Sequence, residues 1–414
     1  MAAFGVGSGG TGRASDPDRP PDDSESHLVA GASWQAFCTT LAGAGERILG
    51  SDFPDHASDR AEGFRHLSRL VVFALQSALE FSDPEFPTFH HFDDDVVKWG
   101  GPNVDNVYMR ARVRGDLAYR ITGTVAGVRE LIISTHEGDM QLEEYGVYEE
   151  RNLAQLTPAS DGELHLTLSA IPQEGDWMPL HPQARYVTVR QYVSDWGDDR
   201  LADLRIERIG SEGLAPNRPT PAHVDEALRT AGEWVERSVC YWNKMLRRVR
   251  TSAADNSLGR PLAVAGGAAD IRYGAGFWCL DPHEALLIEF TPPDARYWSV
   301  QLYSVAWFES LDFVNRQSSL SRESAHLDDD GVFRAVIAHR DPGVPNWLDT
   351  EGRREGVVAY RWAWSNDAPQ PRARALPMDQ IRSHLPPTTP AVDGEERRIR
   401  LAARQAAARR ILRH

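Results

Sequence analysis

The sequence predicts a mainly β protein with accessory helices, in which two β-sandwich or jelly-roll-like units are joined by a long helix. Two stretches, residues 101–215 and 270–377, contain short runs that alternate between apolar and polar residues and end at turn residues, as strands do. Between them, residues 216–252 repeat apolar positions every three or four residues, which indicates a helix. At 414 residues the chain exceeds the size of a single core, so two units are expected.

The N-terminal part is predicted to be helical after a disordered leader. Residues 1–26 are rich in Gly, Ser, Asp and Pro and contain no apolar stretch typical of a signal peptide. Within residues 27–100, apolar side chains recur at helical spacing over residues 28–49 and again over residues 61–81. We interpret both apolar stripes as packing faces.

The helix over residues 216–252 has a clear start. Thr220 is a suitable N-cap, and Pro221 stands at the first helical position, where its missing N–H costs nothing. The apolar stripe that follows, from Val224 to Leu246, is expected to pack as a connector between the two β-units.

The two β-units contain similar features in a similar order, which predicts an internal duplication. Asp161-Gly162 and Asp330-Gly331 each form a turn before an alternating strand. Trp177 and Trp347 follow these turns at offsets of 15 and 16 residues, and strands with Arg190 and Arg361 come later at similar distances. We also expect the strand after Asp105 to correspond to the strand after Asp281. Chance similarity between β-rich segments is the alternative.

The formal net charge of -15 disfavours general binding to nucleic acid, because phosphates would be repelled. The C-terminal stretch differs: residues 386–414 comprise a Pro-rich linker and a basic helical tail with seven arginines and two glutamates. Such a tail could dock on the acidic body, on a membrane surface or on RNA, or it could be a solvated helix.

The cysteine content favours a reducing compartment. Cys38, Cys240 and Cys279 show neither disulfide-like nor metal-type spacing. The longest apolar run is far shorter than the ~20 residues of a membrane span, so no transmembrane segment is expected. We therefore expect a cytoplasmic protein; a homo-oligomer is left open.

Several motifs resemble a known family. The segments are Tyr297-Trp298-Ser299-Val300-Gln301-Leu302, Glu309-Ser310-Leu311-Asp312, Asp341-Pro342-Gly343 and Asn346-Trp347-Leu348-Asp349-Thr350. Together they resemble the domain of unknown function 1214 over residues 270–377. Upstream, the segment from Gly101 to Tyr108 resembles the related domain of unknown function 1254. These resemblances imply a mostly β fold and bring no settled activity or catalytic residues.

Glu309 and Asp312 are the candidate catalytic residues. The two carboxylates stand three residues apart among aromatic neighbours, which could raise one pKa as an acid/base pair requires. Alternatively, they cap a turn or pair with arginines such as Arg316. The sequence contains no Walker loop, Gly-x-Ser-x-Gly elbow or dinucleotide fingerprint, so no organic cofactor is predicted.

The candidate ligand-binding residues come from the family-like motifs. Arg340 is predicted to anchor an anion, and polar side chains surround the aromatic ring of Trp347. The full set is Tyr108, Arg340, Asp341, Asn346, Trp347 and Asp349. In the alternative interpretation, Pro342-Gly343 forms a type II turn, Trp347 plugs the sandwich and the polar residues bond to the loop backbone.

One cluster could hold a divalent metal. His136, Glu137 and Asp139 combine one imidazole with hard oxygen ligands, although such runs in loops are usually solvated.

These features support three functional hypotheses. The first is a cofactor-independent enzyme that acts on a small molecule in a cleft between the β-units. The alternative is a non-catalytic ligand-binding or scaffold protein. The third is a phosphodiester hydrolase that depends on a divalent metal.

Overall fold

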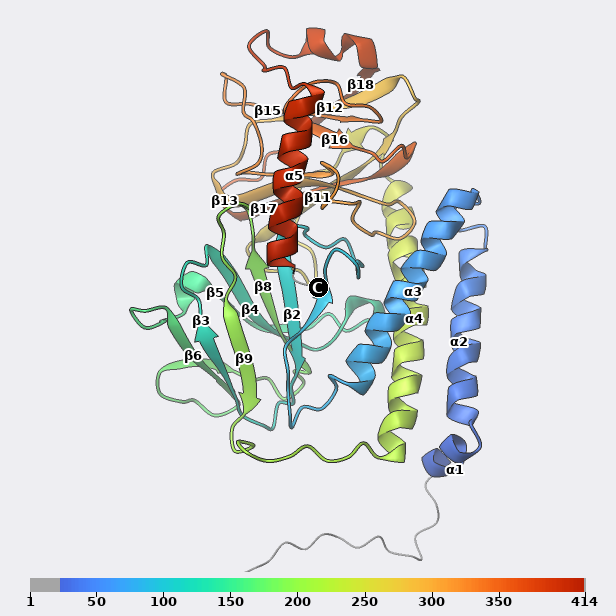
Figure 1. Cartoon of the computed structure of the whole chain (residues 1–414), viewed down its shortest axis with the longest axis vertical. Coiled ribbons are helices and arrows are strands. Elements are labelled where there is room, and N and C mark those ends of the chain that lie inside the picture. Colours follow the sequence, from blue (N-terminus) through green and yellow to red (C-terminus); the bar gives the residue numbers. More distant parts are fainter. Residues whose placement is uncertain (1–22, 413–414) are drawn as a thin grey trace, which may run out of the picture.

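The computed structural model describes residues 23–412. Two β-rich units lie one above the other along the long axis, and a layer of helices runs beside them (Figure 1). This arrangement confirms the predicted mainly β fold with two units joined by a helix. Most of the predicted leader, residues 1–22, lies outside the described residues, and residues 23–26 belong to the first helix.

The helical layer combines the N-terminal helices with the connector. Its members are α1 (Asp23–Val29), α2 (Ala32–Ile48), α3 (Ala57–Leu79) and α4 (Pro221–Arg250). The Thr220 side chain accepts a hydrogen bond of 3.2 Å from the His223 N–H, so the N-cap prediction is confirmed. Phe37 of α2, Phe73 of α3 and Trp234 of α4 are buried in one shared apolar core. α4 passes from the first unit to the second (Figure 1).

The first unit is a sandwich of two sheets. The five-stranded sheet has the order β1 (His90–Asp93), β2 (Asn106–Arg112), β8 (Tyr186–Tyr192), β4 (Glu130–His136), β5 (Val147–Asn152). The four-stranded sheet has the order β7 (Asp176–Pro179), β6 (Glu163–Ser169), β3 (Tyr119–Thr124), β9 (Asp203–Arg208). Apolar side chains of both sheets, such as Val189 and Ile121, form the core between them. Two short 3-10 helices, η1 (Met140–Leu142) and η2 (Leu153–Gln155), flank β5.

The second unit is built in the same way. Its five-stranded sheet has the order β10 (Ser257–Leu258), β11 (Ile271–Cys279), β17 (Glu355–Ser365), β13 (Ala295–Tyr303), β14 (Ser319–Ser321). Its four-stranded sheet has the order β16 (Trp347–Asp349), β15 (Phe333–Ala338), β12 (Glu284–Phe290), β18 (Arg372–Pro377), after which comes the 3-10 helix η3 (Met378–His384). Trp278, Phe333 and Trp362 are buried in its core.

Each strand of the first unit corresponds to the strand numbered nine higher in the second unit. With this correspondence, both sheets have the same strand order in the two units. Even the parallel pairs correspond, because β6 pairs with β7 and β15 with β16. Trp177 and Trp347 lie on the equivalent strands β7 and β16, and Arg190 and Arg361 lie on β8 and β17.

One expected correspondence is wrong by one strand. Asp281 precedes β12, which is the counterpart of β3, whereas the strand after Asp105 is β2. The true counterpart of β2 is β11, which contains Gly274 and Gly276. Glycines interrupt the alternation of apolar and polar residues by which a strand is recognised in a sequence. In β11 they allow close packing, since a Cβ at Gly274 would overlap the Tyr360 ring.

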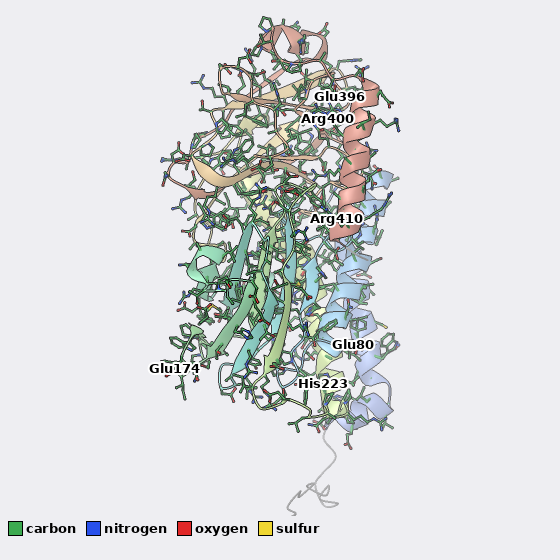
Figure 2. All side chains as sticks on the ribbon, turned by 60° about the vertical axis from the view of Figure 1, so that its left-hand side comes forward. Glu80, Glu174, His223, Glu396, Arg400 and Arg410 are labelled. Atoms are coloured by element: carbon green, nitrogen blue, oxygen red, sulfur yellow. The ribbon has the colours of Figure 1, made fainter. Side chains whose placement is uncertain are left out.

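The basic tail forms α5 (Gly394–Ile411), which packs on the protein body. Its labelled residues Glu396 and Arg400 lie beside the second unit, and Arg410 lies near the first (Figure 2). Arg397 pairs with Asp341 at 2.8 Å, and Arg410 donates to the Trp196 carbonyl at 2.8 Å. α5 therefore bridges both units.

None of the helices within residues 23–412 is both long and apolar enough to cross a bilayer.

Candidate functional site

A cavity of about 390 Å³ lies between the two β-units, and we call it the inter-unit chamber. Its walls come from β2, β4 and β8 of the first unit and from β11 and β17 of the second. Residues 99–103 and the later turns of α4 complete the enclosure. The chamber therefore lies between the outer faces of the two five-stranded sheets.

Strand alternation explains why charged side chains reach this chamber. In β8, Val187 and Val189 point into the core of the first unit, so Thr188 and Arg190 point away from it. In β17, Val358 and Trp362 belong to the core of the second unit, and Arg361 lies on the opposite face. Arg190 and Arg361 thus face the same space.

Arg361 is held by neutral partners. Its Nη1 donates to Gln301 Oε1 at 3.0 Å and to the Tyr303 hydroxyl at 2.8 Å. Its Nη2 donates to the carbonyl oxygen of Gly101. Because the Tyr303 hydroxyl also donates to the Pro102 carbonyl at 2.6 Å, this network joins β13 and β17 to the loop before β2.

The motifs noted in the sequence meet at this boundary. Asn103 Oδ1 accepts hydrogen bonds from Gln301 Nε2 at 2.6 Å and from the Tyr297 hydroxyl at 2.9 Å. Asp105 accepts from the same tyrosine at 2.9 Å and from Trp196 Nε1 at 2.8 Å. Buried polar groups need such partners, so the segment around Asn103 joins the two units.

Arg190 differs from Arg361, because it makes no hydrogen bond or ion pair within the described part of the chain. Arg190 is part-exposed, and it belongs to the lining of the chamber. Tyr108 of β2 lies in register with it, and Tyr273 of β11 lines the same chamber. A buried guanidinium normally has an anionic or hydrogen-bonding partner.

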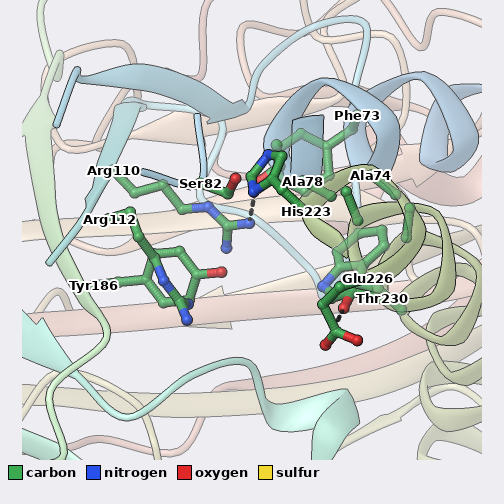
Figure 3. Close-up of a pocket in the computed structure, with 14 residues that line it drawn as sticks. Phe73, Ala74, Ala78, Ser82, Arg110, Arg112, Tyr186, His223, Glu226 and Thr230 are labelled. Carbon is green, nitrogen blue, oxygen red and sulfur yellow. Dashed lines mark hydrogen bonds between the residues drawn. The ribbon is translucent and has the colours of Figure 1, made fainter. Parts of the chain in front are cut away.

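Arg110 stands between the chamber and a second pocket of about 260 Å³, which we call the vestibule. Arg110 Nη1 bonds to both carboxylate oxygens of Asp139 at 3.1 Å, and the guanidinium lies 4.4 Å from the Tyr186 ring centre. Figure 3 shows Arg110, Arg112 and Tyr186 on one side of the vestibule and His223 and Glu226 of α4 on another. Arg110 and Tyr186 line both pockets and form the partition between them.

Two titratable side chains of the chamber are held neutral. Burial, together with the nearby Asp94 carboxylate, raises the pKa of Asp93 well above its usual range. Burial and the charges of Arg190 and Arg110 lower the pKa of His136 to about 3. The Asp93 Oδ1 atom has no hydrogen-bond partner among the described residues. The chamber therefore offers a carboxylic acid and a neutral imidazole.

Three of the residues predicted for the site line the chamber, namely Tyr108, His136 and Asp139. The predicted metal set is divided among separate partners: His136 Nε2 bonds to Ser134 Oγ at 2.8 Å, Glu137 accepts from the Gly146 N–H at 3.1 Å, and Asp139 pairs with Arg110. Within residues 23–412, no three His, Cys, Asp or Glu side chains are grouped to hold a metal ion.

Glu309 and Asp312 lie away from the chamber lining. Glu309 forms an ion pair with Arg69 of α3, and its pair with His66 Nδ1 spans 3.9 Å. Asp312 Oδ1 accepts from the Asn315 N–H at 2.9 Å and so closes a turn. Both carboxylates therefore have structural partners.

The predicted ligand set in the second unit is also separate from the chamber. Arg340 is exposed, Asp341 pairs with Arg397 and Asp349 pairs with Arg316 at 2.9 Å. Asn346 bonds to the backbone of His326 and Arg334, and Trp347 Nε1 donates to the Ala338 carbonyl at 3.0 Å. These contacts hold loops of the second sandwich together.

The sequence patterns indicated Arg190 and Arg361 only as repeated features and did not indicate Arg110. A usable signal existed for the first two. Each is a charged residue that lies out of phase with core-facing apolar residues of its strand, so it must point to the opposite face of the sheet. Arg110 obeys the same rule in β2, but the sequence does not reveal which outer faces enclose a cavity.

The fold and the chamber define a protein of two matched β-sandwiches with a cavity enclosed between them. Residues 280–365 match the family model "Protein of unknown function (DUF1214)". A crystal structure of an uncharacterised protein from Burkholderia cenocepacia is similar to this chain, with 34% sequence identity and a TM-score of 0.79, covering 86% of this chain and 99% of that one. The chain belongs to the same family as the Burkholderia cenocepacia protein.

A second solved structure is less similar. The VPA0106 protein from Vibrio parahaemolyticus is 12% identical, with a TM-score of 0.44, covering 76% of this chain and 97% of that one. No curated protein matches the sequence. The match to the domain of unknown function 1214 agrees with the predicted resemblance in the C-terminal half.

Proposed function

We propose that this protein binds a small organic molecule in the inter-unit chamber. The observation that carries the proposal is the cavity volume of about 390 Å³, which falls in the range of ~300–1,000 Å³ typical of small-molecule sites. Apolar side chains such as Leu246 and Phe277 line it together with a few charged groups, as in most ligand sites. Both β-units contribute, which agrees with the cleft expected from the sequence.

Cofactor-independent turnover in the same chamber is a second candidate function. Asp93 supports it, because a carboxyl group whose pKa is raised by burial can donate a proton near neutral pH. Asp93→Asn would then abolish turnover and leave ligand binding intact. An unchanged rate in this variant would exclude Asp93 as the acid.

Binding can be tested with N-phenyl-1-naphthylamine, a neutral dye that fluoresces in apolar surroundings. Trp99 and Trp242 line the chamber, so energy transfer from tryptophan should report the bound dye. Ala275 lies on β11 at the chamber wall, and Ala275→Trp should fill the cavity and remove saturable binding. The matched control is Ala375→Trp, a change at an exposed alanine of β18.

The outcome is decisive if both variants stay folded by circular dichroism. Loss of dye binding in Ala275→Trp alone supports the chamber. Equal binding by both variants and the parent chain would show that the dye binds elsewhere and would overturn the proposal.

We also propose a cytoplasmic location and an origin of the two units by internal duplication. The three cysteines are free thiols, which supports a reducing compartment. The matching strand orders support the duplication.

A further inference from the structure

We propose that the ligand is an amphiphilic organic anion whose acidic group binds to Arg190 between Tyr108 and Tyr273. This inference rests on the proposed function, since it assigns the chemical class of the molecule in the inter-unit chamber. Its starting point is the unpartnered guanidinium of Arg190, which faces the cavity.

The chamber carries an excess of positive charge. Within the described residues, three arginines line it: Arg110, Arg190 and Arg361. The acidic groups of the lining are Asp139, which is paired with Arg110, and Asp93, whose raised pKa favours the uncharged acid. Arg190 and Arg361 therefore have no carboxylate partner within this lining. An anion would supply one in a setting where water screens little.

Comparison of the two equivalent arginines shows which of them is available. Arg361 already donates to Gln301, Tyr303 and the Gly101 carbonyl, so its donors satisfy the protein's own acceptors. Arg190 lies at the equivalent place on β8 and has no such partners. A guanidinium in this state presents its N–H donors to a ligand, and carboxylate or sulfonate oxygens match that geometry.

Two phenol groups are placed to assist. The Tyr108 hydroxyl accepts a hydrogen bond from the Asn103 N–H at 2.9 Å, so its own proton is left to donate. Tyr273 lines the same chamber from β11, opposite Arg361 in register. Together with Arg190 they form a set of donors suited to a single oxyanion group.

One carboxylate outside the lining acts on Arg190 through its charge, without forming an ion pair with it. Glu150 is close enough to interact electrostatically, but it is not part of the chamber lining. Its Oε1 accepts from the Ala269 N–H at 3.3 Å, and burial raises the pKa of this carboxyl group.

The remaining walls determine the other part of the ligand. Met245, Leu246 and Val249 of α4 and Ile271 and Phe277 of β11 line the chamber with apolar surface. A simple inorganic anion would leave this surface hydrated. A molecule with one acidic group and an aromatic or aliphatic body would contact both kinds of wall.

A matched pair of dyes tests this inference. 1-Anilinonaphthalene-8-sulfonate has the same ring system as N-phenyl-1-naphthylamine and adds one sulfonate group. We expect the parent chain to bind the sulfonate roughly tenfold more tightly than the neutral dye. Arg190→Gln should abolish this preference and leave the affinity for the neutral dye unchanged. Arg190→Lys, which keeps the charge, should retain part of it.

Arg340→Gln is the control, because Arg340 is exposed and distant from the chamber lining; its dye preference should equal that of the parent chain. Thermal unfolding must show that every variant is folded, since this sulfonate dye also binds loosened proteins. An unchanged preference in Arg190→Gln, or no preference in the parent chain, would overturn the assignment of an anion. If Ala275→Trp also leaves binding of the neutral dye intact, the chamber itself is refuted as the site.

Discussion

Arg190 and Arg361 occupy equivalent strands of the two β-units, and each lies in register with a tyrosine on the neighbouring strand. Arg190 of β8 is paired with Tyr108 of β2, and Arg361 of β17 is paired with Tyr273 of β11. Arg361 bonds to the loop that joins the units, whereas Arg190 lines the chamber and makes no hydrogen bond or ion pair with any residue from 23 to 412. The same position is thus tied to the loop in one unit, and in the other it is the position that we propose binds the ligand.

This difference predicts opposite effects on stability. Arg361→Met leaves the Gly101 carbonyl and the Tyr303 hydroxyl without their donor, so the free energy of unfolding should fall by about 3 kcal/mol. Arg190→Met removes a charge that makes no hydrogen bond or ion pair among the described residues, so the free energy of unfolding should change by less than about 1 kcal/mol or increase. Urea unfolding of both variants measures this. Equal losses would contradict the assigned roles.

Gly101 should be sterically restricted. Its φ of 66° lies in the left-handed region, and a Cβ there would overlap the Phe308 ring. Gly101→Ala should therefore cost about 2–4 kcal/mol of stability. Gly331 has a φ of 75° with no atom within 4 Å of an added Cβ, so Gly331→Ala isolates the backbone effect, about 1 kcal/mol. Similar losses in thermal unfolding of the two variants would refute the predicted overlap.

Acid should destabilise the protein through its buried histidines. Burial and the charge of Arg110 lower the pKa of His90 to about 3. Below pH 6.5 the unfolded chain binds a proton at His90, whereas the folded chain does not. The stability that is present above pH 6.5 is therefore lost as the pH falls toward 3. For each such histidine, the free energy of unfolding should fall by up to ~1.4 kcal/mol per pH unit, and this is the slope to be measured.

His90→Phe should reduce this slope, because phenylalanine binds no proton. The new ring should fit the site, since the His90 ring already stacks on Phe81 at 4.3 Å between centroids. His165 is exposed, so His165→Phe serves as the control and should leave the slope unchanged. Urea unfolding between pH 4 and 7.5 gives the comparison. A slope that His90→Phe does not change would exclude His90 as its source.

Glu309 should contribute to stability. Its carboxylate pairs with Arg69, and Lys98, which donates to the Ser310 carbonyl at 3.3 Å, is buried nearby. Glu309→Ala removes the ion-pair partner of Arg69 and one of the carboxylates that act on Lys98, so we expect a loss of about 3 kcal/mol. Dye binding measured below the unfolding temperature should persist, because Glu309 does not line the chamber. Loss of dye binding by a fully folded variant would show that Glu309 contributes to the binding site.

Local patterns were sufficient for much of the fold. Thr220 and Pro221 mark the start of α4, and the Asp-Gly turns mark equivalent strands, because caps and turns depend on residues close in sequence. β11 escaped recognition as the counterpart of β2 because Gly274 and Gly276 serve close contacts with Tyr360 and β10 that only the packed sheet makes.

By itself, the sequence determined the two β-units, the helix between them and the strand positions of Arg190 and Arg361, because alternation and capping act over a few residues. Only the tertiary structure decided that the outer faces of the two five-stranded sheets enclose one chamber, that Arg361 is satisfied by a loop some 260 residues away and that Arg190 is not. It also gave Glu309 and Asp349 structural partners on remote segments. Which charged side chains pair and which remain unpaired depends on how whole sheets pack, and this packing cannot be read from residue spacing along the chain.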